Sequence, residues 1–211
     1  SSDLVLRDSI AGLLAIENVY DERGFLTEVR QGGRTATFGF DGSGRLAAIT
    51  DPLGRTDSLF YDLAGRLVRQ KFADGREMIY SYDAAGNLTS LTPPGRGAHV
   101  FTYTALDQPE SYMAPDVGVP TVTRYRYDLD RQLTHILRPG GDSIVFAYDS
   151  AGRPSAINFD RGLLIFGYHP TTATLQTITA PGGNVLSYTY DGSLPLRETW
   201  SGEVSGSVSV V

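Results

Sequence analysis

The chain of 211 residues is 41% hydrophobic and carries 24 glycines and 11 prolines, which suits one globular domain or repeat array with a buried core. Its formal charge of -6 argues against a nucleic-acid partner, and its lack of cysteine excludes disulfides and thiolate metal sites. No apolar run approaches the roughly 18 residues of a membrane-spanning helix, so no membrane span is expected.

An aromatic-Asp-x-x-Gly-x-Leu phrase recurs throughout the chain at intervals of about 21 residues, as in Tyr61-Asp-Leu-Ala-Gly-Arg-Leu. The aromatic residues that open its nine copies are Tyr20, Phe40, Tyr61, Tyr82, Tyr103, Tyr127, Tyr148, Tyr168 and Tyr190. A fixed period of this size indicates a repeat architecture, so residues 1–211 are predicted to form a single array of about nine repeats. Because the pattern is under way at the first residue, without a preceding Met, we expect a fragment of a longer array.

Each phrase contains the residues that a tight turn needs. A short carboxylate can accept hydrogen bonds from backbone N–H groups two or three residues on, and glycine adopts a positive φ without strain. The carboxylates and glycines in these positions are Asp21, Asp41, Asp62, Asp83, Asp128, Asp149 and Asp191, with Gly24, Gly44, Gly65, Gly86 and Gly152. Asp107 and Arg131 take the glycine position in the fifth and sixth copies. Aspartate enters the left-handed region readily, but nothing in the sequence explains the arginine.

A second turn signal falls midway between phrases. In chain order these signals are Gln31–Arg34, Asp51–Arg55, Ala73–Arg76, Pro93–Gly95, Pro139–Asp142, Asp160–Gly162 and Pro181–Asn184. The segments between turns are about six to eight residues long, which suits strands and is short for helices. The chain is therefore predicted to be all-β, a tandem series of antiparallel β-hairpins with about eighteen strands.

Large side chains recur at fixed distances from the phrase. Two residues before its aromatic stands another large side chain, such as Phe38 before Phe40, and residues two apart share one strand face. Leucines follow six residues after the aromatic at Leu26, Leu46, Leu67, Leu88, Leu133 and Leu196, with Leu175 one residue later. A further apolar residue, such as Ile49, comes three residues after the leucine. Because three is an odd step, either a bulge intervenes or both faces are partly buried.

The number of strands limits the possible architectures. Twisted open sheets seldom exceed about ten strands without curling or splitting, and propeller blades take about forty residues, twice this period. We therefore predict a curled, spiralling β-sheet. Such a ribbon has an unpaired strand edge at each end, so self-association is expected through Asp3 to Leu6 or through the segment after Trp200.

Three phrases resemble a known family: Tyr61-Asp-Leu-Ala-Gly-Arg-Leu, Tyr82-Asp-Ala-Ala-Gly-Asn-Leu and Tyr148-Asp-Ser-Ala-Gly-Arg. They resemble the YD repeats of bacterial rearrangement-hotspot (Rhs) proteins, of the toxin-bearing component of insecticidal ABC toxin complexes, and of animal teneurins. The resemblance covers all nine copies and implies a segment of a hollow shell. In the bacterial relatives the shell encloses a toxin domain cut from the same chain, whereas the teneurin shell is an extracellular adhesion scaffold.

The sequence contains no recognisable catalytic constellation. His99, His135 and His169 stand at unrelated phases of the repeat and form no metal-ligand spacing. The repeated Asp supplies one carboxylate per loop, which is too few for a calcium site. We therefore expect no metal site, no cofactor and no enzymatic activity.

The predicted function is structural: a bacterial YD-repeat shell segment that encapsulates a C-terminal toxin or effector of the same polypeptide, secreted or at the cell surface. Its predicted partners are the rest of its own shell and the enclosed cargo. The alternative is a teneurin-like adhesion or carbohydrate-binding scaffold, because exposed tyrosine rows can stack on sugar rings.

Overall fold

The computed structural model describes residues 4–8, 14–116, 118–119 and 121–209. None of these residues lies in a helix, so this part of the chain has no long apolar helix able to cross a membrane. Its twenty strands are β1 (Arg7–Asp8), β2 (Ile16–Tyr20), β3 (Leu26–Gln31), β4 (Arg34–Phe40), β5 (Leu46–Thr50), β6 (Thr56–Tyr61), β7 (Leu67–Lys71), β8 (Glu77–Tyr82), β9 (Leu88–Thr92), β10 (His99–Tyr103), β11 (Pro109–Met113), β12 (Val122–Tyr127), β13 (Leu133–Leu137), β14 (Ser143–Tyr148), β15 (Pro154–Phe159), β16 (Gly162–Tyr168), β17 (Leu175–Thr179), β18 (Val185–Asp191), β19 (Leu194–Ser201) and β20 (Gly206–Ser209).

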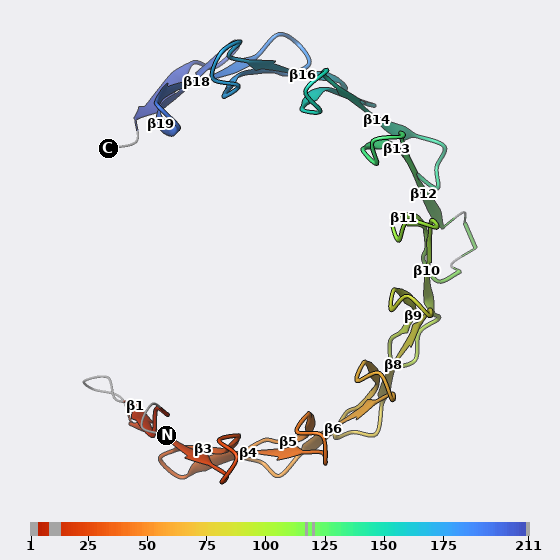
Figure 1. Cartoon of the computed structure of the whole chain (residues 1–211), viewed down its shortest axis with the longest axis vertical. Coiled ribbons are helices and arrows are strands. Elements are labelled where there is room, and N and C mark those ends of the chain that lie inside the picture. The colour runs from red at the N-terminus through yellow and green to blue at the C-terminus, as the bar shows by residue number, and fades with distance from the viewer. Residues whose placement is uncertain (1–3, 9–13, 117, 120, 210–211) are drawn as a thin grey trace. The chain divides into compact units, whose positions relative to one another are not determined.

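The chain divides into two compact units, Ser1–Val100 (unit 1) and Phe101–Val211 (unit 2). In unit 1, each strand from β1 to β8 pairs antiparallel with the next one along the chain. In unit 2 the same holds from β11 to β19 (Figure 1). The prediction of an all-β chain of antiparallel hairpins is confirmed, while a single uninterrupted array of nine repeats stays a prediction.

A β-bulge, seen after eight of the nine phrase turns, explains the odd spacing of the two aliphatic columns. In the β4–β5 hairpin, Phe38 lies opposite Ile49 and Phe40 lies opposite Leu46, which leaves Ala47 as an extra residue. Since Phe38 and Phe40 share one face, their partners Leu46 and Ile49 also share it. The same shift occurs beside Tyr20, Tyr61, Tyr82, Tyr127, Tyr148, Tyr168 and Tyr190. Of the two explanations that the sequence left open, the bulge is the correct one in these hairpins.

In the ninth copy, the sequence assigned the wrong residue to the leucine column. Tyr190 lies opposite Pro195, so Leu196 is the extra residue of the bulge and is 45% exposed. The reason is a tighter turn: β18 and β19 continue to the pair Asp191–Leu194, which shortens the connection and moves the register by one residue.

The sheet has no hydrophobic core. No described side chain is fully buried, which contradicts the expectation drawn from composition. The physical reason is that a single row of hairpins has no second layer against which to pack. One face is nevertheless better covered: Tyr80 and Tyr82 on β8 are half-buried, whereas Ile79 and Ser81 between them are exposed. We call the better covered side, which carries the phrase tyrosines, the aromatic face.

Deleting Ala47 tests whether the bulge sets the register. Without the extra residue, either Leu46 or Ile49 must turn to the opposite face, and we expect the free energy of unfolding of unit 1 to fall by about 1–2 kcal/mol. Urea unfolding followed by circular dichroism measures this. Ala47→Ser is the control, since it keeps the residue count. Equal unfolding midpoints for the two variants would show that the bulge does not hold the register.

Candidate functional site

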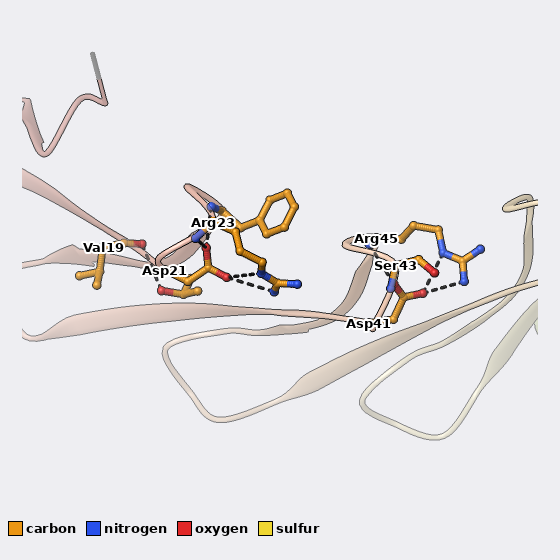
Figure 2. Close-up of polar contacts among 8 residues, drawn as sticks. Val19, Asp21, Arg23, Asp41, Ser43 and Arg45 are labelled. Atoms are coloured by element: carbon orange, nitrogen blue, oxygen red, sulfur yellow. Dashed lines mark hydrogen bonds and ion pairs between the residues drawn. The ribbon is translucent and has the colours of Figure 1, made fainter. Parts of the chain in front are cut away.

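The phrase turn is closed by a single aspartate, as Figure 2 shows for Asp41. One carboxylate oxygen, Oδ1, accepts from the backbone N–H groups of Ser43 at 2.9 Å and Arg45 at 3.0 Å. The backbone adds two bonds, Gly44 N–H to the Asp41 carbonyl at 2.9 Å and Asp41 N–H to the Arg45 carbonyl at 2.8 Å. Gly44 has a φ of 80°, the left-handed conformation that closes the loop. The carboxylate therefore binds two and four residues on, not two and three as the sequence suggested.

The other predicted turns repeat this arrangement with some variation. The bond from the carboxylate to the N–H four residues on recurs at Asp21, Asp62, Asp83, Asp128 and Asp149. Among the described contacts, none joins the Asp191 carboxylate to its turn. In the fifth and eighth copies, Thr104 Oγ1 and His169 Nδ1 accept backbone N–H groups in place of the carboxylate.

Glycine is not required at every one of these left-handed positions. Gly24, Gly65, Gly86 and Gly152 all have a positive φ, and so do three residues that replace glycine: Asp107 at 58°, Arg131 at 64° and, in the eighth copy, Ala173 at 61°. Arg131 keeps the turn bonds, since its N–H donates to the Asp128 carbonyl at 3.1 Å. Nothing in the structure explains why arginine was placed there.

The arginine after the turn glycine forms an ion pair with the aspartate that opens the turn, as Arg66 does with Asp62. Arg66 Nε donates to Asp62 Oδ2 at 2.8 Å, and its Nη2 lies 2.7 Å from the same oxygen. The pKa of the Asp62 carboxyl is lowered from its ordinary value of 3.8, chiefly because the Arg66 backbone N–H donates to it. Desolvation opposes this shift, and the Arg66 guanidinium adds to it. Arg45 and Asp41 form the same pair, so the turn favours the ionised carboxylate.

The same arginine reaches across to the following repeat. Arg66 Nη1 donates to the Asp83 carbonyl at 2.9 Å, and its guanidinium lies 4.8 Å from the centre of the Tyr82 ring. Arg45 contacts Tyr61 and the Asp62 carbonyl in the same way, at 4.7 Å and 3.2 Å. Related contacts reach the carbonyl of the left-handed residue of the next turn instead: Arg153 donates to Ala173 and also lies over the Tyr168 ring, Gln108 donates to Arg131, and Gln132 donates to Gly152. We call this set of contacts the repeat joint.

The first complete repeat uses an aromatic residue in the joint instead of arginine. Phe25 occupies the arginine position and stacks on Phe40 of the next repeat, with ring centroids 4.8 Å apart. A Cβ at Gly44 would lie only 2.9 Å from the Phe25 ring. Glycine is therefore needed there both for the backbone conformation and for the close approach of the neighbouring side chain.

A tyrosine hydroxyl completes the joint. The Tyr82 hydroxyl donates to the Leu67 carbonyl of the preceding repeat at 2.8 Å, and the same bond runs from Tyr61 to Leu46. It recurs at Tyr148, Tyr168 and Tyr190. The ladder between β5 and β6 begins at Ala48 opposite Ser58, so Leu46 lies beyond its end and its carbonyl is available to the hydroxyl.

Sequence reasoning missed the joint. It treated the phrase aromatic as packing and gave the residue after the turn glycine no role. A signal was nonetheless present: in the first seven copies the fifth residue after the aromatic has a long or planar side chain, and eight of the nine phrase aromatics are tyrosine, the residue with a hydroxyl. Only the contact across repeats shows what these two preferences do.

Other chemistry is sparse in the described residues. No group of three His, Cys, Asp or Glu side chains among them could hold a metal ion. An open aromatic hollow of about 510 Å³ lies in unit 2 and is lined by Phe101, Tyr103, Pro109, Ser111, Tyr112, Tyr125, Tyr127 and Leu133.

Tyr82→Phe tests the hydroxyl of the joint. The change leaves the ring and removes the donor to the Leu67 carbonyl, so we expect unit 1 to lose about 1 kcal/mol in the free energy of unfolding. Tyr80→Phe is the matched control on the same strand, because among the described residues the Tyr80 hydroxyl donates to the sulfur of Met78, two residues away, and to no backbone carbonyl. Equal losses in urea unfolding for both variants would contradict a special role for Tyr82.

Acid should weaken the phrase turns. Since the folded-state pKa of Asp62 is lowered, its contribution to stability is present above the ordinary carboxyl pKa and is lost as pH falls through the lowered value. We expect urea midpoints for unit 1 to be level from about pH 7 to about pH 5 and to fall below about pH 4. The urea midpoint of Asp62→Asn should fall less than that of the unmodified chain as the pH is lowered from about 7 to below about 4. Glu22→Gln changes an exposed turn residue, and its midpoint should fall as much as that of the unmodified chain. Equal acid sensitivity in all three would contradict the prediction.

Comparison with known proteins agrees with this repeat geometry. The family model described as Teneurin YD-shell matches residues 1–209. The crystal structure of TcdB2-TccC3-Cdc42 superposes with a TM-score of 0.68 at 15% identity, over 96% of this chain and 14% of that one. The Tc holotoxin pore of Photorhabdus luminescens matches with a TM-score of 0.59 at 15% identity, over 97% and 16%. No curated protein matches the sequence. The predicted resemblance to YD repeats is confirmed: the chain belongs to the Teneurin YD-shell family.

Proposed function

We propose that this chain is a stretch of shell wall that encloses a C-terminal toxin or effector of the same polypeptide in a secreted or cell-surface bacterial protein. The observation that carries the proposal is the single-layer sheet, with an aromatic face and no buried core. A compact enzyme or binding domain buries its apolar side chains in itself, whereas a wall presents one face to what it encloses.

The repeat joint supports a mechanical role for this wall. Each hairpin is attached to the next by the backbone ladder and by a second set of contacts, such as Arg66 with Tyr82 and Tyr82 with Leu67. Both sets link immediate neighbours, so the sheet can be extended by repetition without a core. The chain spans 14% and 16% of the two toxin-complex chains that it matches, so its proposed partners are the rest of a shell and the enclosed cargo.

Strand edges offer a route to those partners. β20 pairs with β19 and with no other described strand, and at the opposite end β1 pairs with β2. Asp3, part of the edge predicted from sequence, lies outside the described residues, while the Val5 carbonyl accepts the Tyr20 hydroxyl at 3.1 Å. We propose that these edges accept further strands, from the same shell or from a second copy.

A second candidate is an adhesion or carbohydrate-binding scaffold, which the aromatic hollow of unit 2 favours. Tyr125 and Tyr127 line it together with Phe101, and planar aromatic rings suit the apolar faces of sugars. This candidate requires the aromatic face to be accessible from outside, whereas enclosure requires that it face the cargo.

Protease protection of the natural full-length polypeptide separates the two functions. We expect a C-terminal fragment that is already cleaved, stays with the shell in native purification and resists added protease, as seen by intact-mass analysis. The control is the same sample unfolded in urea, in which the fragment should digest completely. An uncleaved chain, or a C-terminal region that digests equally fast before and after unfolding, would overturn enclosure and favour the scaffold.

A further inference from the structure

One phrase turn is closed by an imidazole instead of a carboxylate. In the eighth copy, His169 Nδ1 accepts the backbone N–H groups of Thr171 at 3.3 Å and Thr172 at 3.1 Å. The loop is one residue longer than the aspartate turns, since His169 N–H donates to the Thr174 carbonyl at 2.8 Å and Ala173 N–H donates to the His169 carbonyl at 3.0 Å. The His169 side chain accepts from residues two and three positions on, whereas Asp149 accepts from residues two and four positions on, so both side chains close their loops from inside but in different geometries.

An imidazole nitrogen can accept these bonds only while it carries no proton. Neutral His169 must hold its proton on Nε2, which leaves Nδ1 as the acceptor. Once Nδ1 is protonated, an N–H group points at two other N–H donors, and the bonds that close the loop are lost. Histidine changes charge in the range of about pH 5 to 8, whereas an aspartate in this position remains an acceptor to much lower pH.

Backbone strain makes this turn dependent on its hydrogen bonds. The left-handed position is taken by Ala173, with a φ of 61°, and not by glycine. A residue with a Cβ pays for that conformation, so the turn persists only where surrounding contacts hold it.

The turn is also tied to the repeat joint. Arg153 lies 4.3 Å from the ring centre of Tyr168 and donates to the Ala173 carbonyl at 3.4 Å, inside the same loop. Arg153 is balanced by its ion pair with Asp149 at 2.7 Å, and the phrase turn on the other side of His169 carries Asp191. Opening of the loop would remove the carbonyl that the Arg153 side chain binds, but the backbone and carboxylate bonds of the Asp149 turn do not involve that loop.

We propose that His169 makes the eighth phrase turn a pH-sensitive point in the sheet: closed when the imidazole is neutral, open when it is protonated, while the aspartate turns stay closed. The proposal concerns the wall itself and does not depend on what the wall encloses. It predicts a local change in one turn, without unfolding of the hairpins on either side.

Amide hydrogen exchange of the whole chain tests the proposal. After correction for intrinsic exchange rates, the protection of residues 169–174 should fall about tenfold between about pH 7.5 and about pH 5, the loss expected for one or two hydrogen bonds. The matched control within the same molecule is the aspartate turn 149–153, whose protection should be unchanged. Equal changes at the two turns would overturn the proposal.

Two variants separate the titration from a merely structural role. His169→Asp restores a carboxylate and should remain protected at both pH values. His169→Ala should be poorly protected at both. Unchanged protection of residues 149–153 in each variant shows that the surrounding sheet is folded. If His169→Asp kept the loss of protection at the lower pH, His169 would not be the titrating group.

Discussion

The absence of a second layer is the constraint on which the rest of this structure depends. A sheet without a core cannot be held by burial, so each hairpin must be attached to its neighbours along the row. The backbone ladder supplies part of this attachment, and the repeat joint supplies the rest where the strands of successive hairpins separate. Tyr82 makes two of these contacts at once: the Arg66 guanidinium lies over its ring, and its hydroxyl donates to the Leu67 carbonyl.

The bulge is what makes the joint possible with a period near twenty-one residues. By adding one residue to the strand after each phrase turn, it brings both aliphatic columns to the aromatic face, as Leu46 and Ile49 show. Side chains that would otherwise alternate between faces then line one side of the sheet. Coupling between nearest neighbours, rather than a shared core, is the usual basis of stability in repeat proteins.

Where a repeat departs from the common residues, the contacts of the turn or of the joint are kept by a different chemical group. Where Phe25 replaces arginine, the facing aromatic is Phe40, and a stacked pair takes the place of a cation over a tyrosine ring. Thr104 replaces aspartate with another acceptor, which keeps the loop bonds without the ion pair. His169 differs from the other replacements because its Nδ1 atom can accept the loop N–H groups only while the imidazole is neutral.

The sequence by itself determined the all-β class, the hairpin period, the turn positions and most left-handed sites of the phrase turns, including Asp107 and Arg131 but not Ala173. These features are local, since a turn is specified by residues within about five positions of one another. The tertiary structure alone decided the register of the bulges, the displacement of Leu196, the lack of a core and the contacts of the joint. These features depend on which atoms of neighbouring strands and repeats come into contact, and the spacing of residues along the sequence does not specify those contacts.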